Sequence, residues 1–131
     1  MHQAINPPGW PRPKGYSNGI VAKGRFLAIA GMIGWDENEK LVGEDFLSQF
    51  RKALQNVADV LTAAEGGPEH LISLTIYVTD KHEYTAQIKE VGAAYRDILG
   101  KNFPTMALVQ VADLLEPGAK VEIQGLAVLP D

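Results

Sequence analysis

One acidic residue, Glu122, interrupts the apolar run VEIQGLAVL that spans residues 121–129. The alternation of a β-strand would place Val121 and Ile123 on one face and Glu122 on the other. If the Glu122 face meets another subunit, desolvation would raise the pKa of its carboxyl group, as a general acid or base near neutral pH requires. The alternative is a solvated or salt-bridged strand glutamate, and the pattern alone leaves both open.

The sequence lacks the residues that several other kinds of catalytic or metal site require. The chain has no cysteine, which excludes a disulfide framework, a thiolate metal site and a cysteine nucleophile. The three histidines, His2, His70 and His82, are not spaced as metal ligands, so each is expected at the surface or in a loop. The segment GMIG at 31–34 lacks the lysine and the spacing of a phosphate loop, and no serine lies in a nucleophile elbow.

Length and charge limit the class of protein further. The 131 residues predict a single domain covering 1–131, and 46% hydrophobic residues is ordinary globular usage. The net charge is −4, and the basic residues Arg12, Lys14, Lys23 and Arg25 are scattered, which argues against nucleic acid as a partner. We find neither a signal peptide nor an apolar window of membrane-spanning length. We therefore expect a cytoplasmic protein with a small-molecule partner, without nucleic-acid or membrane binding.

Apolar periodicity predicts the elements that hold Glu122 in place. Two short runs, 20–22 and 26–30, predict a β-hairpin with Gly24 in its turn. The further elements, in chain order, are a helix over 46–64 that starts near Asp45, a strand over 71–78, a helix capped by Asp80 and closed by Gly100, and strands over 106–111 and 121–129 joined by a turn at 116–118. The order β-β-α-β-α-β-β is typical of an α+β domain.

The sheet that these strands form would have one face without helices. Two helices cover only one face of such a sheet. The other face is not plainly polar, because Ala107, Val109 and Val111 point away from Met106 and Leu108 in the strand over 106–111. An apolar sheet face of this kind is normally buried by another subunit. The pattern therefore predicts an oligomer, without fixing the number of subunits.

Four segments follow one another in a distinctive order: KGYSNG at 14–19, AGMIG at 30–34, FPTM at 103–106 and VEIQGLA at 121–127. They resemble, in the same order, the Gly-Pro-Tyr-x-x-Gly, Ser-Gly-x-Ile-Pro, Phe-Pro-x-Arg and Val/Ile-Glu-Ile-Glu-x-x-Ala motifs of the Rid (YjgF) family of reactive-intermediate deaminases. The resemblance extends from about residue 6 to the end of the chain. It implies a chorismate-mutase-like mixed sheet with two helices on one face, assembled as a homotrimer with clefts between subunits.

In the relatives that hydrolyse imines and enamines, a tyrosine, a glutamate and an arginine line each cleft. Tyr16 and Glu122 match the first two, so the resemblance implies that they are catalytic. Tyr16 as an anchor of its loop is the alternative. The arginine position is Met106, which cannot form the two-pronged pair with a substrate carboxylate. Gly92 and Leu108 fall where the family has an asparagine and, frequently, a cysteine. This chain therefore departs from the deaminases that act on 2-aminoacrylate.

The rest of the expected substrate site is mainly apolar. Gly31 is expected to supply backbone groups, and an apolar wall is expected from Met32, Trp35, Phe103, Met106 and Leu108. Trp35 as ordinary packing between subunits is the alternative. Arg12 and Lys14 could meet an anionic group at the cleft mouth, or be solvated loop charges, and the sequence does not decide whether either replaces the missing cation.

The leading hypothesis is hydrolysis of a reactive enamine or imine with release of ammonia, from a substrate bulkier or less acidic than 2-aminoacrylate. Glu122 would handle the proton and the water, Tyr16 would orient the substrate or hold the water, and no metal or organic cofactor is implied. The alternative is a non-catalytic trimer of the same family that binds a small molecule or a protein, which the loss of the arginine favours. Relatives described as endoribonucleases suggest a third activity, which the acidic charge balance disfavours.

Overall fold

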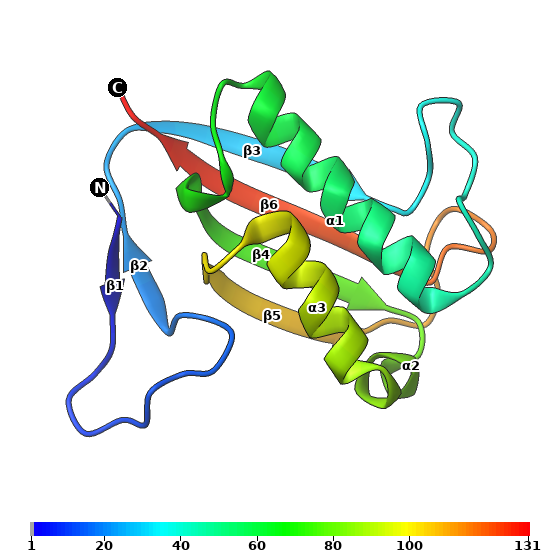
Figure 1. Cartoon of the computed structure of the whole chain (residues 1–131), viewed down its shortest axis with the longest axis horizontal. Coiled ribbons are helices and arrows are strands. Elements are labelled where there is room, and N and C mark those ends of the chain that lie inside the picture. Colours follow the sequence, from blue (N-terminus) through cyan, green and yellow to red (C-terminus); the bar gives the residue numbers. More distant parts are fainter. Residues whose placement is uncertain (1) are drawn as a thin grey trace.

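The computed structural model describes residues 2–131, and its centre is a four-stranded mixed sheet (Figure 1). The strands lie in the order β3 (Arg25–Met32), β6 (Val121–Leu129), β4 (Leu71–Val78) and β5 (Thr105–Gln110). Strand β6 is antiparallel to both β3 and β4, whereas β4 and β5 are parallel. The strands predicted over 71–78 and 121–129 have the expected bounds, and the expected α+β class is confirmed.

Helix α1 (Phe46–Ala63) begins where the sequence predicts. Asp45 is its N-cap, and the Asp45 carboxylate accepts the backbone N–H of Ser48 at 2.9 Å. This hydrogen bond holds the pKa of the Asp45 carboxyl group below its ordinary value. The chain leaves the helix at Ala64 and, after a short 3-10 turn over Pro68–His70, enters β4.

The second helical region consists of two helices, where the sequence predicted one. Helix α2 (Lys81–Ala86) is capped by Asp80, whose side chain accepts the His82 N–H, and α3 (Ile88–Leu99) ends at Gly100. Gln87 separates them at φ −119° and ψ 30°, and its N–H bonds three residues back to the Tyr84 carbonyl. The tightened turn redirects the chain, so the continuous helix expected after Asp80 is wrong.

Helices α1 and α3 lie side by side on one face of the sheet and bury the main core, as predicted (Figure 1). The predicted apolar stripe of α1 is buried, with Phe46, Phe50, Ala53, Leu54, Val57 and Leu61 at its centre. These side chains pack on Ile29, Leu74, Ile76, Val121 and Ile123 of the sheet. Burial of this apolar area from water is the dominant stabilising term of the fold.

Gln49 is a polar side chain fully enclosed in this core. Its amide group donates to the carbonyls of Gly43 at 2.9 Å and Gly118 at 3.0 Å, and its side-chain oxygen accepts the Lys120 N–H at 2.8 Å. One side chain of α1 therefore satisfies three backbone groups from the loop before α1 and the turn before β6.

The predicted hairpin around Gly24 does not form. Strand β2 (Gly19–Val21) pairs with β1 (Gln3–Ile5) in a separate two-stranded ribbon, and β3 pairs with β6 instead. Gly24 has φ +149°, and a side chain there would overlap the carbonyl of Leu129 at the end of β6. The glycine thus serves a close backbone approach to the last strand rather than a tight turn back to β2.

The face of the sheet opposite the helices carries apolar side chains in solvent. Phe26 on β3 is 76% exposed and Val109 on β5 is 41% exposed. Within the described part of the chain, no helix covers this outer face. The trimer expected to bury it stays a prediction.

Candidate functional site

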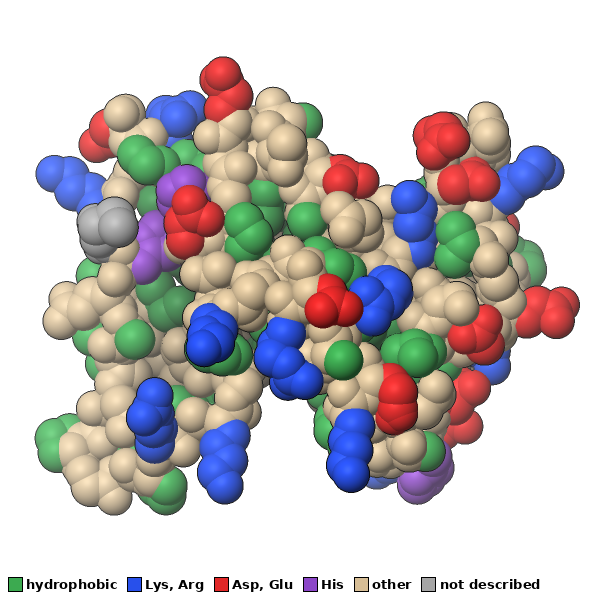
Figure 2. All heavy atoms as spheres, in the orientation of Figure 1, with side chains coloured by type: hydrophobic (Ala, Val, Ile, Leu, Met, Phe, Trp, Pro, Cys, Tyr) green, Lys and Arg blue, Asp and Glu red, His purple; other side chains and the backbone are tan. Residues whose placement is uncertain are grey.

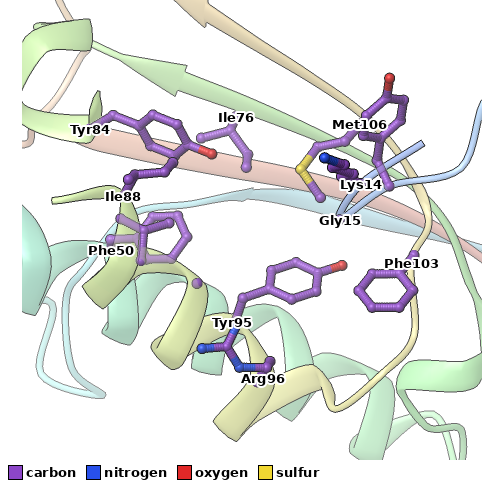
Figure 3. Close-up of a pocket in the computed structure, with 13 residues that line it drawn as sticks. Lys14, Gly15, Phe50, Ile76, Tyr84, Ile88, Tyr95, Arg96, Phe103 and Met106 are labelled. Atoms are coloured by element: carbon purple, nitrogen blue, oxygen red, sulfur yellow. The ribbon is translucent and has the colours of Figure 1, made fainter. Parts of the chain in front are cut away.

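A cavity of about 420 Å³ opens between the loop that joins β1 to β2, helices α2 and α3, and the β5 edge of the sheet (Figure 3). Its volume lies in the range of small-molecule sites. It is lined by Lys14, Gly15, Tyr16, Phe50, Ile76, Tyr84, Ile88, Val91, Gly92, Tyr95, Arg96, Phe103 and Met106. In the space-filling view the surface is hollowed between the N-terminal loop and the helices, with Lys and Arg side chains on both sides of the hollow (Figure 2).

Tyr16 reaches this cavity because the following residue fixes its loop to the strand entering the β5 edge. The Ser17 N–H donates to the Pro104 carbonyl at 3.1 Å, and the Ser17 hydroxyl donates to the Phe103 carbonyl at 2.5 Å. These bonds hold Tyr16 beside Phe103, and both aromatic side chains are 41% exposed at the cavity rim. Two expected site residues that lie 87 positions apart in the sequence are thereby brought together.

Met106 enters the cavity from the sheet. It pairs with Leu74 of β4, and Leu108 pairs with Ile76, so both β5 side chains point to the helix-covered face. Met106 lines the cavity, whereas Leu108 packs against the core without lining it.

Glu122 lies on the opposite face of the sheet, as alternation predicts. It pairs with Tyr77 across β4, and both side chains are half-buried on the outer face. A Cβ atom at Gly31 would overlap the Oε2 atom of Glu122, so the carboxylate lies directly against the β3 backbone. No hydrogen bond or ion pair to the Glu122 side chain occurs within residues 2–131. Glycine at position 31 is what leaves room for the carboxylate in this position.

The remaining two expected wall residues do not reach the cavity or Glu122's face. Met32 pairs with Ile123 and packs against the helix-side core, because a register shift between Ile29 and Met32 changes the alternation of β3. Trp35 lies in the loop after β3, where its carbonyl accepts a 3.0 Å hydrogen bond from the Asn56 side chain. The structure thus gathers Tyr16, Phe103 and Met106 in one group and Gly31 with Glu122 in another, and the full apolar wall is not assembled in one chain.

The charged lining of the cavity is entirely cationic. Lys14 and Arg96 line it, and none of its described lining residues is acidic. Burial raises the pKa of the Tyr84 and Tyr95 hydroxyls, so both phenols remain neutral, and the Tyr95 hydroxyl donates to the Asn102 carbonyl at 3.0 Å. The sequence analysis missed Arg96. The sequence held one indication of Arg96: it lies four residues after Gly92, and this spacing places both residues on one face of a helix.

Across residues 2–131, no group of three or more His, Cys, Asp or Glu side chains could hold a metal ion. Over the same span, no helix combines the length and apolar character needed to cross a membrane.

The profile of the family described as Endoribonuclease L-PSP matches residues 11–129. The chain belongs to this family. It is the family that the sequence motifs indicated, under its other names of Rid, YjgF and RutC. The four motif segments therefore gave the correct family assignment.

Among relatives in this family, the Drosophila melanogaster RutC family protein UK114 is 33% identical over 114 residues, covering 86% of this chain and 78% of that protein. The human 2-iminobutanoate/2-iminopropanoate deaminase is 28% identical over 86% of this chain and 79% of its own length. Among solved structures, the Rid family protein YyfB of Yersinia pestis has a TM-score of 0.83 at 30% identity and covers 98% of both chains. The Rid family thus includes imine deaminases.

Proposed function

We propose that this Rid family member hydrolyses an imine or enamine with release of ammonia, and that its substrate is bulkier or less acidic than 2-aminoacrylate. Family membership supports the reaction class, since relatives include deaminases of 2-iminobutanoate and 2-iminopropanoate. The observation that carries the proposal to this chain is the Glu122 carboxylate, which lies against Gly31 without a partner in residues 2–131. A carboxylate free of structural bonds is available to exchange protons.

The reaction needs a proton and a water molecule, and it balances without a cofactor. An enamine accepts a proton on carbon to become an iminium ion. Water then adds to the iminium carbon, the nitrogen takes up a proton, and the C–N bond breaks to leave a carbonyl compound and ammonia. In this scheme Glu122 delivers the proton and directs the water, which is general acid–base catalysis. Tyr16 orients the substrate from the cavity rim.

Glu122 and Tyr16 belong to one cleft only if they come from different chains. Within one chain the cavity lies on the helix side of β5, whereas Glu122 lies on the outer face of β6, with β4 between these two strands. We therefore propose a homotrimer in which the outer sheet face of one protomer covers the cavity side of its neighbour. The exposed Phe26 and Val109 of the outer face supply apolar area for that interface.

The size of the cavity and Met106 within it favour a bulky substrate. A small imino acid finds no cation at position 106 and leaves most of the roughly 420 Å³ unfilled. An aryl or branched side chain would gain about 25 cal/mol for each Å² of apolar surface removed from water.

Ammonia release from imines generated by an amino-acid oxidase tests the proposed function. Imines of phenylalanine and leucine should be hydrolysed faster than 2-iminopropionate, with the oxidase alone as the background. Faster hydrolysis of 2-iminopropionate would contradict the proposed size preference. Failure to accelerate any imine of the panel would favour the non-catalytic binding trimer instead.

Mixing two inactive variants tests the shared cleft. Glu122→Gln keeps the cavity, and Tyr16→Ala keeps the carboxylate. If each site takes Glu122 and Tyr16 from different chains, co-refolding equal amounts should restore about a quarter of the wild-type activity, because about a quarter of the sites receive both intact residues. Light scattering should give three times the 14.2 kDa mass of the chain. Activity that stays at the level of the separate variants, or a stable monomer, would contradict the shared cleft.

A further inference from the structure

The cavity carries a cation that the family motifs do not predict. Arg96 lines the cavity from α3, four residues after Gly92. A Cβ atom at Gly92 would lie 3.3 Å from Nη1 of Arg96, so the guanidinium rests against the bare backbone of the glycine. Gly92 therefore leaves room for the Arg96 guanidinium beside the cavity.

The Arg96 guanidinium is also available for a ligand. The other α-helical arginine, Arg51 of α1, forms a 3.2 Å ion pair with Asp97. Across residues 2–131, neither an acidic side chain nor a carbonyl accepts a hydrogen bond from the Arg96 guanidinium. With Lys14 as the other charged lining residue, the cavity presents two cations and an otherwise apolar or neutral surface. Such a site favours one anionic group on its ligand.

Much of the cavity surface suits an apolar group. Phe50 and Ile76 form the buried floor, each only 1% exposed, and Met106 adds a flexible apolar side chain. Figure 3 shows Tyr84, Ile88 and Phe50 at the end of the cavity away from Lys14. The cavity therefore has an apolar end away from Lys14.

We propose that Arg96 binds the carboxylate of the substrate, and that the substrate is a 2-imino acid with an aryl or branched alkyl side chain. The inference rests on the proposed function and selects, from its two alternatives, the bulky substrate. The planar guanidinium can take a carboxylate in a two-pronged hydrogen bond. Met106 leaves space for the substrate side chain. Arg96 of α3, on the opposite wall, takes the place of the arginine that relatives have at position 106.

Binding of two matched probes to the assembled protein tests this role without any turnover. Phenylpyruvate is a stable 2-oxo acid analogue, and phenylacetone is the same molecule without the carboxylate. The wild-type protein should bind phenylpyruvate at least about tenfold more tightly, as expected for a charge-assisted hydrogen bond. Arg96→Gln should remove most of that preference by weakening phenylpyruvate alone, as measured by calorimetry.

Lys89→Gln is the matched control, since it removes one positive charge from the same helix at a position outside the cavity lining. It should leave the preference for phenylpyruvate unchanged. A general loss of structure in Arg96→Gln would weaken both probes alike, and that result, or an unchanged preference, would overturn the role of Arg96. If Arg96→Gln still released ammonia and kept its preference for phenylpyruvate, the role of Arg96 would be wrong while the proposed imine hydrolysis would stand. The two proposals can therefore fail independently.

Discussion

Replacing Glu122 by glutamine is expected to lower imine turnover by at least about a hundredfold, because a positioned acid or base contributes roughly 10²–10⁴-fold. Glutamine has the shape of glutamate and still fits beside Gly31, but its amide cannot carry the proton. Binding of phenylpyruvate should change by less than about threefold, since shape and apolar contacts remain. Steady-state ammonia release and calorimetry measure the two quantities separately.

Glu37→Gln provides a control with the same change of charge at an exposed loop position. Its turnover and its binding should both match the wild type. If the Glu122 variant retained wild-type turnover, the carboxylate would have no part in proton transfer and another group would have to deliver it. If it lost binding together with turnover, Glu122 would be a binding residue.

The largest stability effect is expected from Gln49→Leu. Leucine fits an apolar core, but it leaves the Gly43 carbonyl, the Gly118 carbonyl and the Lys120 N–H without the partner that they share. A backbone group held out of water without a hydrogen bond costs about 1–3 kcal/mol, and the three partners are only partly shielded from solvent, so the free energy of unfolding should fall by at least about 1 kcal/mol. Urea denaturation at a fixed protein concentration measures the change.

Gln55→Leu is the corresponding substitution on the exposed face of α1. Gln55 bonds to Asp59 one turn away, at the surface. Its replacement should change the free energy of unfolding by less than about 0.5 kcal/mol. Equal effects of the two substitutions would mean that the Gln49 hydrogen bonds are not what secures the two loops.

Local periodicity predicted the elements of the main sheet and its helices well. The α1 stripe and the alternation of β4 are set by residues close in the sequence, and tertiary packing selects the same faces. The pairing of β3 could not be predicted in this way, because its partner β6 lies nearly a hundred residues later. A short apolar run beside a glycine fits a local hairpin equally well, and only the close approach at Gly24 distinguishes the two arrangements.

The site was predictable where strand alternation holds. The face of Glu122 followed from its neighbours in the strand, whereas the register shift after Ile29, which turns Met32 toward the helix-side core, has no sequence signature. Arg96 was missed because its relation to the cavity depends on how α3 packs beside β5 and the N-terminal loop. The family resemblance singled out position 106, where the arginine of relatives is missing, whereas the cation in this cavity is Arg96 on the opposite wall.

The β1–β2 ribbon has a bearing on how the cavity exchanges its contents with solvent. The two strands pair only with each other, so the loop between them, with Lys14 and Tyr16, adds no hydrogen bond to the main sheet. Its ties include the bonds of Ser17 to the 103–104 segment and a 2.9 Å bond from the His2 ring to the His70 carbonyl. A two-stranded ribbon is marginally stable alone.

Such a ribbon can open locally at a free-energy cost well below that of global unfolding. Each opening would withdraw Lys14 and Tyr16 from the cavity, while the core beneath α1 and α3 stays packed. We therefore expect ligand exchange to depend on this opening of the ribbon more than on any movement of the sheet.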